Sequence, residues 1–132
     1  MHCLRGASEI QSKVLSKIKD PAVRAYVVWV PMLPMDAAGA VAEATKYMPD
    51  RRVSHFWDAE GVLKKDYAAV LQLEQPAWDV YFAYGRDAEW KAERPPDPAY
   101  WMHQLSQLGQ ERRLDPEQFA AEVNKLLSQG GK

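Results

Sequence analysis

The chain has 132 residues, 47% of them apolar and 27% charged. This balance is typical of a single soluble globular domain and excludes a disordered chain. Seventeen basic and eighteen acidic side chains give a formal net charge of −1, so we expect no nucleic-acid or membrane-surface partner. The single cysteine excludes an internal disulfide. Residues 1–20 lack an apolar stretch of signal-peptide or membrane-spanning length, which makes the cytoplasm the default location.

Helices and strands are expected to alternate in the first half of the chain. Apolar residues recur every three or four positions from Leu4 to Ile18, which predicts a helix that ends at Asp20-Pro21. The apolar run 25–33 predicts a strand covered on both faces, as in parallel sheets. Asp36 is expected to cap a second helix, which reaches Met48 and turns Val41, Ala44, Tyr47 and Met48 inward.

The second half of the chain has three further strands and three further helices in this interpretation. A short strand over 53–57 precedes a helix that Asp58 caps. Residues 78–84 alternate as a strand, with 89–93 as the hairpin partner, and 100–108 is expected to be a short helix. The last helix has Asp115 as its N-cap, Pro116 in the first position and Gln118 in a capping-box pattern. This order predicts a single domain over 1–132 with a mixed α/β sheet.

Cys3 is the first candidate functional residue, because it falls in the first turn of the first predicted helix. Helix N-termini carry unpaired N–H groups and a positive dipole end, which favour a thiolate. The alternative is a small, inert residue near a frayed terminus. His2, His55 and His103 show no metal-ligand spacing with Cys3, so we expect no metal and no cofactor.

Three segments resemble the thioredoxin-like superfamily, in particular uncharacterised bacterial members related to thioredoxins and peroxiredoxins. The first is Cys3 followed by Leu4-Arg5-Gly6-Ala7, and the second is the path 56–71 that begins Phe56-Trp57-Asp58. The third is Gln75-Pro76 directly before the strand that ends at Gly85. The resemblance implies a thioredoxin-like mixed sheet flanked by helices, truncated at its N-terminus, because the strand before the first helix would be missing.

The same resemblance implies thiol–disulfide exchange with a protein or a small-molecule thiol or disulfide. Cys3 would be the second cysteine of a Cys-x-x-Cys motif whose first cysteine would precede Met1, and His2 would lie between the two. Pro76 would be cis and would hold the substrate chain together with Gln75, close to Cys3. Without the upstream cysteine, Cys3 would form mixed disulfides or a sulfenic acid, and turnover would need an external thiol.

Two other interpretations remain open at this level. One is a redox-inactive binding module that uses an aromatic groove near Pro76 for a partner's extended chain, since five tryptophans and six tyrosines are many for this length. The other is a fragment that keeps the fold and has no function of its own.

Overall fold

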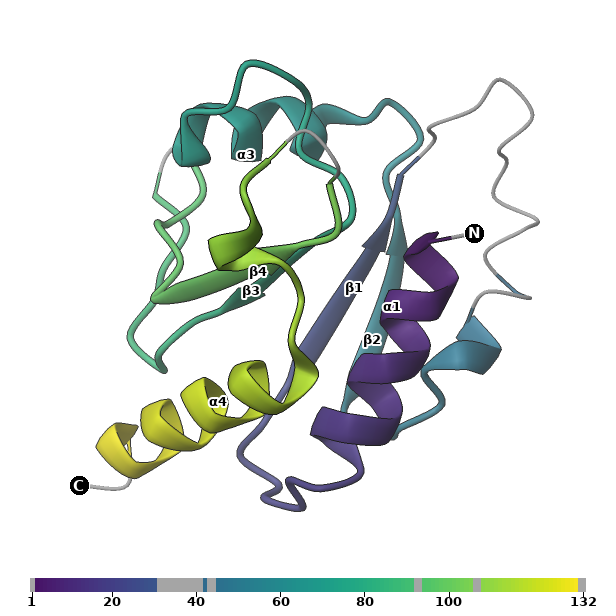
Figure 1. Cartoon of the computed structure of the whole chain (residues 1–132), viewed down its shortest axis with the longest axis vertical. Coiled ribbons are helices and arrows are strands. Elements are labelled where there is room, and N and C mark those ends of the chain that lie inside the picture. The colour runs from purple at the N-terminus through teal and green to yellow at the C-terminus, as the bar shows by residue number, and fades with distance from the viewer. Residues whose placement is uncertain (1, 31–41, 43–44, 92–93, 106–107, 131–132) are drawn as a thin grey trace.

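A computed structural model describes residues 2–30, 42, 45–91, 94–105 and 108–130, and for residues 2–4 it describes the backbone only. Two helices, α1 (His2–Ile10) and α4 (Pro116–Gly130), lie at the two ends of the chain, and α3 (Val62–Leu71) lies between them (Figure 1). The strands are β1 (Ala25–Trp29), β2 (Val53–Trp57), β3 (Val80–Ala83) and β4 (Tyr100–His103). Three short helical turns complete the order: η1 (Gln11–Leu15, π-type), η2 (Thr45–Tyr47) and η3 (Gln110–Arg112).

The core forms where α1 and α4 pack against the strands. The predicted apolar stripe of the first helix is confirmed, because Ala7, Ile10, Val14 and Ile18 are all buried. Met102 of β4 and Phe119 of α4 join the same cluster. Burying these side chains removes apolar surface from water, the main favourable contribution to folding.

The strands form two separate two-stranded sheets where the sequence predicted one mixed sheet. β1 and β2 are parallel, with Ala25 opposite Val53 and Trp29 opposite Trp57. β3 and β4 are antiparallel, with Val80 opposite His103 and Ala83 opposite Tyr100. In the described part of the chain no ladder joins one sheet to the other. The mixed α/β class is therefore confirmed, but as two small sheets.

The partner of β3 is a second correction. The hairpin predicted over 89–93 is wrong, since β3 pairs with β4 and Lys91 forms only an isolated bridge to Arg94. The helix predicted over 100–108 is also wrong, because Tyr100–His103 is a strand. Its aromatic residues have high strand propensity, and pairing with β3 satisfies backbone groups that a helix in this place would leave unpaired.

The segment between β1 and β2 is described only in part. The expected N-cap Asp36, with Val41 and Ala44, lies outside the described residues, and η2 is a single 3₁₀ turn. Met48 is buried as predicted, whereas Tyr47 is 44% exposed, which contradicts the prediction that it points inward. Among the described residues, no helix combines the length and the hydrophobicity needed to cross a bilayer.

The cap predicted at Asp115 is confirmed, whereas the N-cap of α3 is Gly61 and not Asp58, which lies three residues before it. The carboxylate of Asp58 accepts the N–H of Leu63 in the first turn of α3 (2.9 Å). Asp115 accepts the N–H groups of Glu117 (3.1 Å) and Gln118 (3.2 Å) at the start of α4. The side chain of Gln118 does not complete a capping box, because its Nε2 donates to the hydroxyl of Tyr100 at 2.6 Å.

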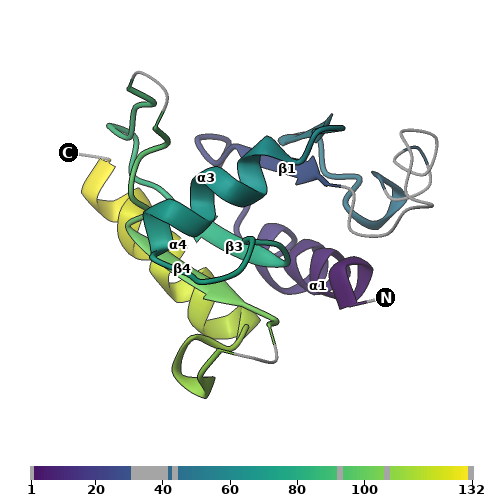
Figure 2. The same ribbon diagram turned by 90° about the horizontal axis from the view of Figure 1, so that it is seen from above.

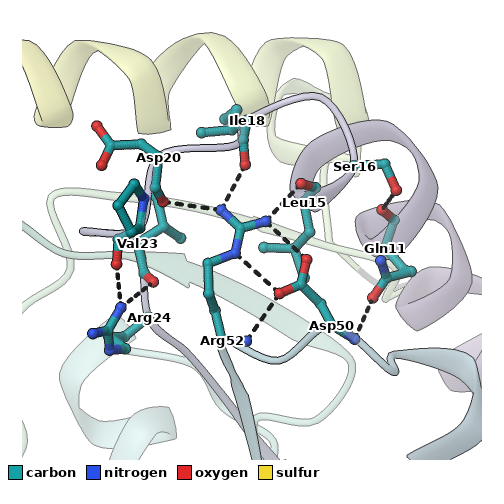
Figure 3. A network of polar contacts seen from close by, with 10 residues as sticks. Gln11, Leu15, Ser16, Ile18, Asp20, Val23, Arg24, Asp50 and Arg52 are labelled. Carbon is teal, nitrogen blue, oxygen red and sulfur yellow. Dashed lines mark hydrogen bonds and ion pairs between the residues drawn. The ribbon is translucent and has the colours of Figure 1, made fainter.

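Arg52 joins the end of the first helical segment to the start of β2 (Figure 3). Its Nε and Nη2 donate to the two carboxylate oxygens of Asp50 at 3.0 and 2.8 Å. The remaining donors bind backbone carbonyls: Nη1 binds Ile18 (2.6 Å) and Asp20 (3.0 Å), and Nη2 binds Leu15 (2.7 Å). All five N–H groups of the guanidinium thus have acceptors. The hydrogen bonds from Arg52 lower the pKa of Asp50 from 3.8 to about 2.

Arg52→Lys should therefore destabilise the folded protein, although the substitution leaves the net charge unchanged. A lysine keeps the positive charge but cannot bind the carboxylate through a planar fork and three carbonyls at once. We expect a loss of about 2 kcal/mol in the free energy of unfolding, measured by urea denaturation. Arg51→Lys, at the exposed neighbouring residue, is the control and should change the free energy of unfolding little. Equal losses in the two variants would contradict the role given to Arg52.

His103 is the most buried titratable side chain described, at 1% exposure. Its Nδ1 accepts the N–H of Leu105 (3.0 Å), which leaves Nε2 to donate to the carbonyl of Gly109 (3.1 Å). The ring is therefore neutral in this arrangement. Burial lowers the pKa of His103 from 6.5, and the positive charge of Arg113 lowers it further, against raising contributions from the Gly109 hydrogen bond, Asp79 and Glu111.

Stability should therefore depend on pH through His103. Above pH 6.5 both folded and unfolded chains hold the ring neutral, and this contribution is constant. As the pH falls below 6.5 the unfolded chain binds a proton that the folded chain does not, so the free energy of unfolding should fall. His103→Gln should be less stable at pH 8 and should lose this slope between pH 7 and 5 in urea denaturation. An unchanged slope in the variant would assign the effect to other groups.

Candidate functional site

Cys3 lies where the sequence placed it, in the first turn of α1, and His2 is the first residue of that helix. Gln75 and Pro76 lie in the loop between α3 and β3 and are exposed. The predicted cis bond before Pro76 is wrong: the described chain has no cis peptide bond, so Gln75–Pro76 is trans. Because residues 2–4 are described by their backbone alone, the expected proximity of Cys3 to Gln75 and Pro76 stays a prediction.

Polar groups meet at the start of β3, in a group that we call the Asp79 cluster: Asp79, Tyr81 and Gln104. The Tyr81 hydroxyl donates to Oδ1 of Asp79 at 2.6 Å, and the Gln104 N–H donates to the Asp79 carbonyl at 3.1 Å. Oδ2 of Asp79 is buried and has no hydrogen-bond partner among the described residues. Asp79 also has a positive φ of 55°, a conformation that Asp tolerates better than most residues.

The Asp79 cluster is in contact with α1 through Gly6. A Cβ built on Gly6 would overlap the hydroxyl oxygen of Tyr81 and would lie 2.9 Å from its Cζ and 3.1 Å from Nε2 of Gln104. Glycine is therefore required by the close approach of helix and strand. Since Gly6 follows Cys3 by three residues, about one helical turn, the N-terminal part of α1 is held against the beginning of β3.

The loop that carries Gln75 and Pro76 is held from both sides. The Ala77 N–H donates to the Lys64 carbonyl in the first turn of α3 (2.9 Å), and the Leu73 N–H donates to Ala68 at the other end of that helix (2.8 Å). Asp79 then begins the pairing with β4. The loop thus leads directly from α3 into the Asp79 cluster.

The aromatic residues near α3 pack on one another. Tyr67 stacks on Phe82 with ring centroids 4.4 Å apart, and its hydroxyl is 2.9 Å from that of Tyr84. The Tyr84 hydroxyl also lies 3.2 Å from the Pro96 carbonyl, which can only accept. Burial raises the pKa of Tyr84, and the contact with Tyr67 adds to this. Trp90, 46% exposed, meets Tyr67 edge-on. These contacts are those of a packed cluster, and they do not favour the aromatic-groove alternative.

Two cavities lie elsewhere on the surface. A shallow one of about 330 Å³ lies between the end of α3 and β4, lined among others by Arg94, Trp101 and Arg112. The Arg112 guanidinium stacks over the Trp101 ring at 4.7 Å. The other lies between the end of η1 and α4, near Lys17 and Asn124. Neither is lined by Pro76 or by the Asp79 cluster.

His55 and His103 have structural partners, and the described residues contain no group of three or more His, Cys, Asp or Glu placed to hold a metal. His55 Nδ1 accepts the indole N–H of Trp29 (3.1 Å), and its Nε2 lies 3.1 Å from the Met48 carbonyl. This ties β2 to β1 and to the turn before it. His103 binds the backbone of Leu105 and Gly109, as described above.

The sequence did not reveal the Asp79 cluster. Asp79 reads as a solvent-facing or strand-neighbouring residue within an alternating strand, and nothing local marks Gln104 or Gly6. Comparisons of the chain with protein-family models, with curated proteins and with solved structures find no match.

Gly6→Ala tests the contact between α1 and β3. Inside a helix, alanine is about 1 kcal/mol more favourable than glycine. The substitution would therefore stabilise α1 if the helix did not contact Tyr81. We expect instead a loss of about 1 to 3 kcal/mol, because the methyl group displaces Tyr81 from Asp79. Gly85→Ala is the control, since a Cβ there would lie 4.0 Å from Leu126 and meet no clash. Urea denaturation measures both, and a stabilised Gly6→Ala protein would contradict the contact.

Proposed function

We propose that this protein is a thioredoxin-like domain that carries out thiol–disulfide exchange through Cys3. The observation that carries the proposal is the position of Cys3 in the first turn of α1, one turn before the helix contacts β3 at Gly6. Unpaired N–H groups and the helix dipole favour a thiolate there, and the packing of Gly6 gives the helix end a fixed position.

The order of elements supports the same proposal. α1, whose first turn contains Cys3, is followed by β1, β2, α3, the antiparallel pair β3–β4 and the terminal helix α4. This order agrees with the resemblance in part, because the helix expected between β1 and β2 falls mostly outside the described residues and Tyr100–His103 is a strand. The Gln75-Pro76 loop precedes β3, and the Asp79 cluster lies between it and α1. In this proposal the exposed backbone of Gln75 and Pro76 supports the substrate chain, and His2 adjoins the thiol in sequence.

With one cysteine, the reaction needs an external thiol. The Cys3 thiolate attacks one sulfur of a substrate disulfide, the substrate S–S bond breaks, and one substrate thiolate leaves. A mixed disulfide between Cys3 and the other half of the substrate remains. A glutathione thiolate then attacks the substrate sulfur of this mixed disulfide, which releases Cys3 as a thiolate and leaves a glutathione–substrate disulfide. A second glutathione thiolate attacks the glutathione sulfur of that disulfide, releases the other substrate thiolate and forms glutathione disulfide. Two external thiols are thus oxidised to one disulfide for each substrate disulfide reduced.

The folded chain should react faster with a disulfide than the unfolded one does. The test compares the rate with 5,5′-dithiobis(2-nitrobenzoate) at pH 6 for the native protein and for the same protein in urea, where the helix is lost. We expect the native rate to be about tenfold higher, because the thiolate fraction is larger. Glutathione-dependent reduction of hydroxyethyl disulfide should be lost in Cys3→Ser and kept in Ser8→Ala. A native rate no higher than the unfolded rate, or full activity in Cys3→Ser, would refute the proposal.

A further inference from the structure

The cavity of about 330 Å³ beside β4 is lined by the end of α3 (70–72), by residues of the segment 94–101 and by Arg112. We call it the α3–β4 cavity. Figure 1 and Figure 2 both show α3 beside the β3–β4 sheet, and the stacking of Tyr67 on Phe82 joins the two. The volume is at the lower end of the range for ligand sites, about 300 to 1,000 Å³, so it suits a small molecule better than a polypeptide.

Hydrogen-bond donors gather in this cavity around Trp101 and Arg112. The Arg112 Nη1 donates to the Trp101 carbonyl at 3.1 Å, and its guanidinium lies over the Trp101 ring, 4.7 Å from the centroid. These contacts orient the guanidinium and leave Nε and Nη2 for another acceptor. Because the N–H and C=O of a strand residue point to the same side, the Trp101 N–H also points towards the side of Arg112. A planar carboxylate matches such a set of donors.

The end of α3 supplies acceptors to the same cavity. The two N–H groups that follow the helix bond to the carbonyls of Ala68 and Ala69. The helix therefore offers no donor to the later carbonyls of Val70 and Leu71, and both of these residues line the cavity. The negative end of the helix dipole also lies here. This part of the cavity suits an ammonium group.

The charged side chains of the cavity leave a carboxylate for the same purpose. Asp97 is the acidic residue among those that line it, beside Arg94 and Arg112. Nη2 of Arg94 lies 3.4 Å from Oδ1 of Asp97, and the two side chains are 62% and 76% exposed, so this ion pair is weak. Asp97 can therefore bind a second cation. The cavity thus combines a site for a carboxylate with a site for an ammonium group.

We propose that the α3–β4 cavity binds a free α-amino acid with an apolar side chain. The carboxylate accepts hydrogen bonds from Arg112 and from the Trp101 N–H, and the ammonium group donates to Asp97 and to the carbonyls at the end of α3. The apolar side chain packs on Pro98 and Ala99. An anion alone would meet the negative end of the helix dipole, and a cation alone would meet two guanidinium groups, whereas a zwitterion satisfies both.

The test adds L-leucine to the whole ¹⁵N-labelled chain and follows the amide signals by NMR. At up to about 20 mM leucine we expect saturable shifts at Trp101 and Leu71 and a Kd of about 1 mM, as befits a small ligand in a shallow site. The buried Val14 amide, in the core, should not shift. L-Leucinamide lacks the carboxylate and 4-methylpentanoate lacks the ammonium group. Each should bind at least about tenfold more weakly than leucine.

Variants locate the two halves of the site. Arg112→Gln should bind leucine at least about tenfold more weakly, whereas Arg51→Gln, at an exposed arginine outside the cavity, should bind as the wild type does. Asp97→Asn should weaken the binding of leucine but not that of 4-methylpentanoate, because only leucine carries an ammonium group. Cys3→Ser should bind leucine normally, so this binding is tested separately from thiol exchange.

Three results would overturn the proposal. The first is the absence of a shift at the Trp101 amide at the highest leucine concentration. The second is equal binding of leucine and leucinamide, or unchanged affinity in Arg112→Gln. The third is equal binding of leucine and 4-methylpentanoate, which would show a site for carboxylates in general.

Discussion

The guanidinium of Arg52 is the interaction on which the arrangement of the first half of the chain depends. It binds the Asp50 carboxylate through a fork and three carbonyls at the end of the first helical segment. The Asp20 carbonyl also accepts the N–H of Val23, whereas carbonyls at the end of a helix, such as that of Leu15, cannot be satisfied by the helix itself. Arg52, directly before β2, thus sets how α1 and η1 lie against β1 and β2 (Figure 3). Because Cys3 lies in the first turn of α1, Arg52 also helps to set the position of that turn.

The division into two sheets is the main difference from the single mixed sheet that the sequence predicts. β3 and β4 are held on one face by α3 and on the other by the core of α1 and α4, whereas the outer face of β1–β2 carries exposed Tyr26 and Phe56. Interior strands without a second partner leave backbone donors and acceptors unpaired, which is costly away from water. The contact of Gly6 with Tyr81 keeps α1 in place beside β3.

The proposed thiol exchange depends on the sulfur at the N-terminus of α1 and on the loop before β3 that carries Gln75 and Pro76. The Asp79 cluster lies between these regions, since Tyr81 belongs to β3 and contacts Gly6 of α1. A change at this contact is therefore expected to affect both regions.

Local pattern was enough to determine several elements: the apolar stripe of α1, the strands at 25–29, 53–57 and 80–83, and the cap of α4 by Asp115. Each depends on periodicity or on bonds between residues near in sequence. Only the tertiary structure decided that β4 pairs with β3, that Arg52 binds the carbonyl of Ile18, 34 residues away, and that Gly6 meets Tyr81. These contacts join distant segments whose own residues are compatible with other partners, as Tyr100–His103 shows by reading locally as a helix and pairing as a strand. Which of these segments pair depends on which backbone donors and acceptors still lack partners once the helices have packed.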